Sequence, residues 1–187
     1  MNAFNTMNSM TKKILYLWEY PPGPLTGGSY STGVAGYTYG NGTYTVSASS
    51  ERNGAGTCSY AFDESLSTYW QWTKPASATT TVSGTSYTGE WVQLYLPVSI
   101  PIMAYEVGNT STTNNMPLQW VLAGSTNGST WYNLDDQTFS TVEWTSGYRR
   151  FFVSNNRNTN YNYFRFIYQN GNGTYPVLCE LKFYAPR

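Results

Sequence analysis

The residues best suited to chemistry stand close together in residues 61–70, where an acid, several hydroxyls and a large aromatic side chain follow one another. Asp63 precedes the hydroxyl of Thr68 by five positions. Calcium takes about six to eight oxygen ligands from carboxylates, hydroxyls and backbone carbonyls. The segment therefore predicts a cation-binding turn. The alternative is a metal-free turn that Asp63 caps by accepting backbone hydrogen bonds.

The composition excludes much of ordinary enzyme chemistry. The chain has no histidine, which removes Ser-His-Asp and Cys-His catalysis, histidine-ligated zinc and a histidine pH switch. A glycosidase that uses two paired carboxylates is the remaining enzymatic alternative. The sequence indicates no second pair of acids, because Asp135 and Asp136 are typical of a loop. We therefore expect a protein that is not an enzyme.

The surface is expected to consist mostly of hydroxyl, amide and tyrosine groups, because aromatics make up 18% of the chain and charged residues only 11%. Such a surface suits sugars or protein neighbours. A sugar site needs aromatic rings beside a few planar polar groups. The loop candidates for this ligand-binding site are Trp72, Trp144, Tyr148 and Arg149. Each of them could instead anchor an interface, and we assign Trp70 and Trp131 to the core.

Two further groups of residues leave alternatives open or exclude a partner. Cys58 and Cys179 are too few for a four-thiolate metal site and are either bridged or buried as free thiols. Residues 148–165 interleave arginines with aromatics, as single-strand nucleic-acid faces do. Because the net charge is zero and Arg165 is better explained as paired within the fold, we expect no nucleic-acid partner.

The chain divides into an extended N-terminal arm, residues 1–37, and one domain, residues 38–187. Proline and glycine clusters between residues 19 and 40 disfavour a helix. The arm either reaches another subunit or lies on its own domain as a linker. The apolar run 14–18 is expected to dock as a strand; it is too short for a classical signal peptide, and no segment is long enough to span a membrane.

Along the rest of the chain, turn-forming residues separate short runs of aromatic and β-branched residues. No segment has the apolar periodicity of an amphipathic helix. The expected strands are residues 43–47, 91–96, 118–123, 150–153, 163–168 and 177–184. In residues 91–96, Val92, Leu94 and Leu96 should face the core. Pro97 and Pro101 should mark the end and restart of pairing. The pattern predicts an all-β, antiparallel β-sandwich or jelly roll.

The order of motifs resembles the discoidin or coagulation-factor type C domains, which include the family 32 carbohydrate-binding modules. The segments that carry the resemblance are Ala48-Ser49-Ser50, Ala61-Phe62-Asp63 with Thr68 and Trp70, and residues 91–96, 125–131, 163–167 and 178–181. The resemblance implies a discoidin-like sandwich of eight strands. The chain departs from the family at Glu64, where a glycine is usual, and at Tyr95, where an aspartate is usual.

The resemblance also implies a ligand set for a structural Ca²⁺ ion between the turn and the last strand. Its side-chain ligands would be Asp63, Thr68 and Glu180. Its backbone carbonyl ligands would be Tyr60, Ser65 and Cys179. Such an ion would tie an early turn to the end of the chain. In the metal-free alternative, Glu180 is a solvated strand residue.

A second resemblance concerns the arm. Tyr20-Pro21-Pro22, leading into residues 39–44 and a discoidin-like domain, is similar to virion proteins of large eukaryotic DNA viruses. It implies a minor capsid, spike or fibre component in the virion, with other virion proteins as partners of the arm and cell-surface or virion glycans as further ligands. The alternative function is a dedicated carbohydrate-binding, lectin-like module, and an enzyme ranks third.

Overall fold

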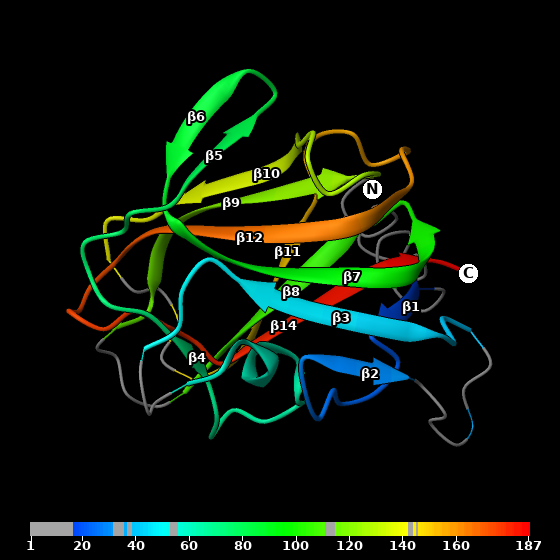
Figure 1. The fold of residues 1–187 in the computed structure, drawn as a ribbon, viewed down its shortest axis with the longest axis horizontal. Coiled ribbons are helices and arrows are strands. Elements are labelled where there is room, and N and C mark those ends of the chain that lie inside the picture. Colours follow the sequence, from blue (N-terminus) through cyan, green and yellow to red (C-terminus); the bar gives the residue numbers. More distant parts are fainter. Residues whose placement is uncertain are drawn as a thin grey trace, which may run out of the picture.

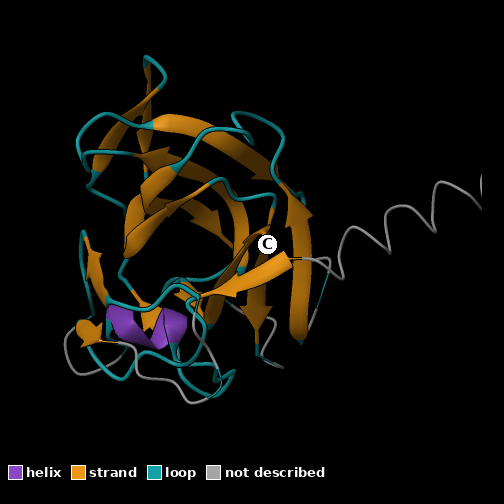
Figure 2. Ribbon diagram, turned by 90° about the vertical axis from the view of Figure 1, so that its right-hand side faces the viewer, coloured by secondary structure: helices purple, strands orange, loops and turns teal. Residues whose placement is uncertain are grey.

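Two antiparallel sheets pack face to face in the computed structural model, which describes residues 17–31, 36, 39–52, 56–110, 115–141, 144 and 146–187. Figure 2, turned by 90° from Figure 1, shows the strands curving around a common interior. The one helix among the described residues is a short 3₁₀ helix, η1 (Cys58–Phe62). The predicted all-β, antiparallel sandwich is confirmed.

The larger sheet has six strands in the order β10-β9-β12-β7-β3-β2. Their bounds are β2 (Ser29–Ser31), β3 (Thr43–Ala48), β7 (Glu90–Ile100), β9 (Pro117–Ser125), β10 (Tyr132–Thr138) and β12 (Tyr161–Gly171). Strands β12, β7 and β3 run side by side across the centre of Figure 1. Four of the six predicted strands therefore belong to this sheet.

The smaller sheet has four strands in the order β1-β14-β8-β11. Their bounds are β1 (Leu17–Tyr20), β8 (Ala104–Asn109), β11 (Gly147–Phe152) and β14 (Glu180–Pro186). Two short ribbons complete the fold: β4 (Trp70–Gln71) pairs with β13 (Val177–Leu178), and β5 (Thr79–Val82) pairs with β6 (Thr85–Thr88). The β5–β6 hairpin projects from the body of the molecule in Figure 1.

The core lies between the two sheets and follows the alternation of strand β7. Val92, Leu94 and Leu96 are fully buried, as predicted, and their neighbours on β7 are partly exposed. Trp70 lies in the same core. Trp131 is also buried, but in a smaller cluster on the other face of the six-stranded sheet, which the β5–β6 hairpin helps to cover.

The N-terminal segment is part of the sandwich wherever the structure describes it. Strand β1 pairs with β14, and Glu19 forms a 2.7 Å salt bridge with Lys182. Strand β2 pairs with β3, and Leu25 is buried and donates its N–H to the Phe62 carbonyl at 2.8 Å. Residues 17–31 thus lie on their own domain, as in the linker alternative. Residues 1–16, 32–35 and 37 of the expected arm fall outside the described residues.

Two local expectations are corrected. Asp135 and Asp136 lie on strand β10 rather than in a loop. Asp135 is buried because it accepts hydrogen bonds from the Tyr105 hydroxyl at 2.7 Å and the Ser154 hydroxyl at 2.9 Å. These long-range partners override the turn preference of aspartate.

Strand β7 does not end at Pro97 but continues to Ile100. A register shift against β12 falls between the pairs Tyr95–Tyr163 and Ile100–Tyr161, so a bulge accommodates the proline. Pairing of β7 with β3 ends at Tyr95.

Candidate functional site

The turn after η1 brings together three of the predicted metal ligands. The Asp63 carboxylate accepts the Ser65 N–H at 3.0 Å and the Thr68 hydroxyl at 2.7 Å. The Thr68 hydroxyl also lies 3.3 Å from the Ser65 carbonyl oxygen. Carboxylate, hydroxyl and carbonyl oxygens therefore converge within six residues, and Asp63 also caps the turn as the metal-free alternative proposes.

Glu64 adopts the backbone conformation for which glycine is favoured. Its φ angle is 60°, in the left-handed region. A residue with a Cβ pays about 1 kcal/mol for this conformation. Glu64 therefore holds a conformation that a glycine would adopt without strain, and the strain is borne by its own backbone.

Glu180, the first residue of β14, is only 1% exposed because the turn covers it. Gly108 on the neighbouring strand makes room for this arrangement, since a Cβ there would lie 2.6 Å from the Glu180 Cβ and 2.8 Å from Leu66. The carboxylate accepts the backbone N–H groups of Glu64 and Leu181, but its Oε2 has no partner among the described residues. The alternative of a solvated Glu180 is therefore wrong.

The electrostatics of Glu180 follow from this burial. Loss of solvation raises the pKa of its carboxyl to about 8, with a lowering contribution from Lys182 and a raising one from the Asp63 carboxylate. A buried carboxylate oxygen without a partner is unfavourable unless a proton or a cation compensates it. Glu180 and Asp63 therefore lie close enough to influence each other, and neither forms an ion pair with a cation among the described residues.

The last two predicted ligands, Tyr60 and Cys179, precede the two acids in the chain, Tyr60 by three residues and Cys179 directly. Tyr60 belongs to η1, and Cys179 falls between β13 and β14, outside both ladders. No three His, Cys, Asp or Glu side chains form a metal-binding group within the described ranges. A cation here would depend on two carboxylates with hydroxyl and carbonyl oxygens, a donor set that fits Ca²⁺ better than zinc.

The two cysteines are buried free thiols, so the alternative of a disulfide does not hold in this structure. Burial raises the pKa of the Cys58 thiol to about 12 and that of Cys179 to about 11. Neither thiol is thus prepared to act as a nucleophile.

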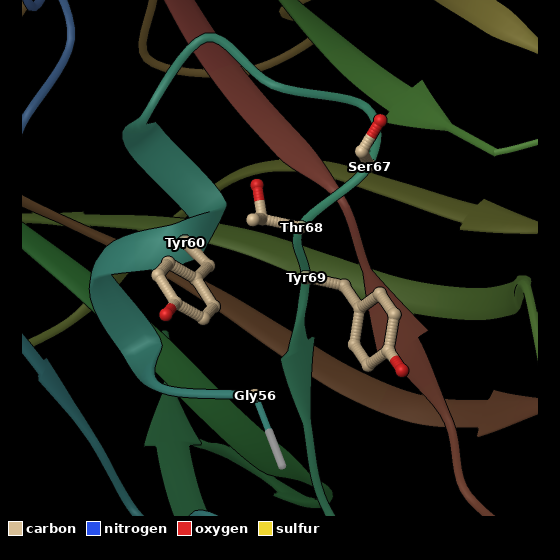
Figure 3. A pocket seen from close by; sticks show the side chains of 5 residues that line it. All are labelled: Gly56, Tyr60, Ser67, Thr68 and Tyr69. Carbon is tan, nitrogen blue, oxygen red and sulfur yellow. The ribbon is translucent and has the colours of Figure 1, made fainter.

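A small hollow of about 190 Å³ opens beside the turn. Its lining consists of Gly56, Tyr60, Ser67, Thr68 and Tyr69. Figure 3 shows the tyrosine rings on either side of Thr68, one rising from η1 and the other from the chain that leads into β4. Gly56 has a φ of 75°, and a Cβ there would lie 2.7 Å from the Gln71 nitrogen, so only glycine fits this position.

A second feature adjoins the hollow through Gln71, whose N–H donates to the Gly56 carbonyl at 3.4 Å. The Gln71 side-chain oxygen accepts a 2.9 Å hydrogen bond from Arg52, and its amide nitrogen donates to the Tyr175 carbonyl at 3.4 Å. The Arg52 guanidinium lies 3.8 Å above the Tyr175 ring. We call Arg52, Gln71 and Tyr175, which connect to the lining of the hollow through Gln71, the rim.

The sequence prediction missed Tyr69 and the whole rim. The available signal was the pair of tyrosines that flank the acidic turn, Tyr60 and Tyr69. Arg52 and Tyr175 are 123 positions apart in the chain, and only the pairing of β4 with β13 brings their segments together. No local pattern could show this contact.

Trp72 is not a surface platform, contrary to the prediction. It is 1% exposed and packs edge-to-face against Tyr168, with ring centroids 5.6 Å apart. Its N–H continues the β4–β13 ladder by donating to the Pro176 carbonyl at 3.3 Å. This extended pairing turns the indole toward the core, where it cannot stack on a ligand.

The other three predicted ligand residues do not form one site, although the Arg149 guanidinium lies 5.5 Å from the Trp144 ring centroid. Trp144 and Arg149 lie against Phe139, at 6.4 Å between ring centroids and 5.0 Å from guanidinium to ring, in a partly buried aromatic cluster. Tyr148 is exposed on β11, with the Lys182 ammonium 5.1 Å from its ring centroid. A ligand-binding role for them stays a prediction.

Arginines of residues 148–165 are held by separate contacts. Arg150 forms a 2.7 Å salt bridge with Glu106. Arg165 lies between two indoles, 3.8 Å from the ring of Trp91 and 4.1 Å from that of Trp131, and burial lowers its pKa to about 10. Arg165 is thus paired within the fold, as predicted. No helix in the described part of the chain has the length and apolar character needed to cross a membrane.

Comparison with known proteins identifies the fold. No protein-family model and no curated protein matches the sequence. Among solved structures, the family 32 carbohydrate-binding module of Clostridium perfringens NanJ, in complex with galactose, is 16% identical with a TM-score of 0.57, over 75% of this chain and 93% of the module. The C. perfringens module CpGH89CBM32-5, in complex with GalNAc-β-1,3-galactose, is 15% identical with a TM-score of 0.59, over 76% and 95%.

An F5/8 type C domain from Bacteroides fragilis is 14% identical with a TM-score of 0.56, and the match covers 77% of this chain and 92% of that domain. The predicted discoidin-like sandwich is therefore confirmed as the fold.

Proposed function

We propose that the protein is a carbohydrate-binding domain that holds a sugar in the hollow between Tyr60 and Tyr69. The observation that carries the proposal is the pairing of two tyrosine rings with the Ser67 and Thr68 hydroxyls around one small hollow. Aromatic rings pack against the C–H faces of a sugar, and hydroxyls exchange hydrogen bonds with its rim. Solved modules of the same fold bind galactose and GalNAc-β-1,3-galactose.

The same site supports a structural Ca²⁺ ion as part of the proposal. The Asp63, Thr68 and Glu180 side chains would hold it, together with the carbonyls of Tyr60, Ser65 and Cys179. When bound, the ion supplies positive charge to the buried carboxylate of Glu180 and the partly exposed carboxylate of Asp63. Because Thr68 belongs to both the turn and the wall of the hollow, we expect chelation to weaken sugar binding as well as the fold.

We infer that binding is the whole activity and that the protein is not an enzyme. The virion role, with capsid partners reached through residues 1–37, stays a prediction that gains no support from the solved structures named above. The carbohydrate-binding alternative accounts better for the fold and the hollow. Hydrolysis of a glycoside by the purified chain would contradict the non-enzymatic part of the proposal.

The test is a glycan array with the full chain, in Ca²⁺ and in chelator, followed by titration of the best sugar. Tyr69→Ala and Tyr60→Ala should each weaken binding about tenfold, as expected for loss of an aromatic contact of about 1.5 kcal/mol. Phe152→Ala is the matched control, because Phe152 is 58% exposed on β11, outside the lining of the hollow. Unchanged affinity in both tyrosine variants would exclude this hollow as the sugar site.

A further inference from the structure

We propose that the sugar bound at this site carries a carboxylate, as uronic acids do, and that Arg52 on the rim recognises it. The inference rests on the proposed function and names the class of sugar that the hollow and rim select. It comes from the way in which the fold holds Arg52 and from the absence of an ion pair between Arg52 and any described acid.

Arg52 is held in one orientation by neutral groups. Gln71, which is buried, accepts one guanidinium N–H at 2.9 Å, and the Tyr175 ring supports one face of the guanidinium at 3.8 Å. A guanidinium has five N–H donors, and the contact with Gln71 is its one hydrogen bond to the described residues. The remaining donors form a planar fork, which matches the two oxygens of a carboxylate.

The charge of Arg52 is not neutralised by any acid in the described part of the chain. Its neighbour Glu51 is turned to other groups, because its carboxylate accepts the Cys58 N–H at 2.6 Å and the Thr57 hydroxyl at 3.2 Å. Arg150 shows the contrasting case, since it pairs with Glu106 at 2.7 Å. Arg52 therefore presents a fixed positive charge on the rim.

A second cation extends the same ribbon. Lys74 continues the β4–β13 pairing by donating its N–H to the Thr174 carbonyl at 3.3 Å, one residue from Tyr175. Its ammonium donates to the Gly171 carbonyl at 2.6 Å and to the Asn170 side chain at 3.2 Å, both neutral acceptors. In a chain of zero net charge, this end of the sandwich thus gathers two cations that form no ion pair with a described acid.

The test compares matched sugars that differ only in the acid group: galacturonic acid with galactose, and glucuronic acid with glucose, as free sugars and as short oligosaccharides titrated into the full chain. We expect the wild type to bind one acid at least about tenfold more tightly than its neutral partner, the size expected for a charge-assisted pair. Arg52→Gln should remove this preference by lowering the affinity for the acid sugar to that of its neutral partner. The preference should also weaken at high salt.

Two further variants keep the result interpretable. Arg157→Gln removes an exposed arginine in residues 154–160 and should change neither affinity. Arg52→Lys keeps the positive charge but lacks the planar guanidinium donors, and it should retain part of the preference for the acid sugar. If a thermal melt shows that Arg52→Gln does not fold, Arg52→Lys still tests whether Arg52 recognises the carboxylate. Tyr69→Ala should weaken acid and neutral sugars alike.

The outcomes separate the inference from the function on which it rests. Equal affinity for acid and neutral sugars, or an acid preference that survives Arg52→Gln, overturns the inference and leaves the sugar site standing. If Arg52→Gln lowers the affinity for both sugars equally, Arg52 has only a structural role, and the inference is also overturned. No binding of any sugar by the folded chain overturns both the inference and the proposed function.

Discussion

Two carboxylates in this protein are buried to nearly the same degree but differ in the number of hydrogen bonds that they receive. Glu90 begins β7 and is 2% exposed, and Glu180 begins β14 and is 1% exposed. Glu90 accepts hydrogen bonds from the hydroxyls of Ser49, Ser50 and Ser77 and from the N–H groups of Ser77 and Ala78. Glu180 receives two backbone N–H groups, and its Oε2 receives no donor among the described residues.

The difference appears in the pKa values of the two acids. Burial raises the pKa of Glu90, but the hydrogen bonds from Ser49, Ser77, Ser50 and Ala78 outweigh it, and the net shift is downward. Burial dominates at Glu180 and raises its pKa to about 8. A buried acid whose oxygens receive hydrogen bonds from the protein has a structural role. A buried acid with an oxygen that receives no hydrogen bond marks a site for a proton or a cation.

The comparison also explains the Ala48-Ser49-Ser50 motif. Both serine hydroxyls donate to the Oε2 of Glu90 from the end of β3, and the loop at residues 77–78 donates to its Oε1. Glu90 thus joins three separate segments of the chain. The motif is structural, although its short polar pattern resembles a binding loop.

The largest effect should come from Glu90→Ala. It leaves three serine hydroxyls and two backbone N–H groups without their shared acceptor, and we expect a loss of about 3 to 5 kcal/mol in the free energy of unfolding. Denaturant unfolding measures it. Asp136→Ala, which removes an exposed acid of β10, is the control and should change stability by less than about 0.5 kcal/mol. A loss below about 1 kcal/mol for Glu90→Ala would show that Glu90 is not a structural tie.

The next effect is the response of the Glu180 site to calcium. At a Ca²⁺ concentration of about 100 times Kd, binding should stabilise the fold by about 2.7 kcal/mol, or roughly 5 to 10 °C in Tm for a chain of this length. Differential scanning calorimetry in Ca²⁺ and in chelator measures the shift. Asp63→Asn and Glu180→Gln should abolish it, and Asp136→Asn should not. An equal Tm in Ca²⁺ and chelator for the wild type would contradict the cation site.

The sequence was most informative where structure is local. Alternation of Val92, Leu94 and Leu96 predicted the inward face of β7 because side chains on a strand alternate between faces. Asp63 and Thr68 lie five residues apart, so their meeting in one turn could be predicted from spacing. The order of the landmark motifs predicted the fold for the same reason, since each motif is a short strand or turn.

The sequence was least informative where distant strands decide the environment. The partner of Arg52, Tyr175, depends on the pairing of β4 with β13, two strands of two residues each with no alternation to detect. The burial of Trp72 depends on the same pairing. The β5–β6 hairpin consists mostly of threonine and serine, so its strands look like a loop.

The most specific contrast between the two acids is their opposite dependence on pH in chelator. Folded Glu180 keeps its proton up to about pH 8, and the unfolded carboxyl releases it near pH 4.5. Between these values the folded state binds more protons, so stability falls as pH rises, by about 2 kcal/mol from pH 6 to pH 8. Glu90 acts in the other direction, because its lowered pKa contributes stability that is lost as pH falls below about 4.5.

Unfolding measured from pH 3 to pH 8.5 separates the two contributions. The pH 6 to 8 range is free of other side chains with an ordinary pKa there, since the chain has no histidine, and burial raises the pKa of both cysteines to about 11 or above. Glu180→Gln should remove the loss of stability between pH 6 and 8 and leave the loss in acid. Ca²⁺ should stabilise the wild type more at pH 8 than at pH 6, because it binds the ionised carboxylate. If wild type and Glu180→Gln have the same slope between pH 6 and 8 in chelator, Glu180 is already ionised in the cation-free fold. Glu90 and Glu180 would then both be ionised carboxylates in the fold, and the missing hydrogen-bond donor at Glu180 would not distinguish a binding site from a structural acid.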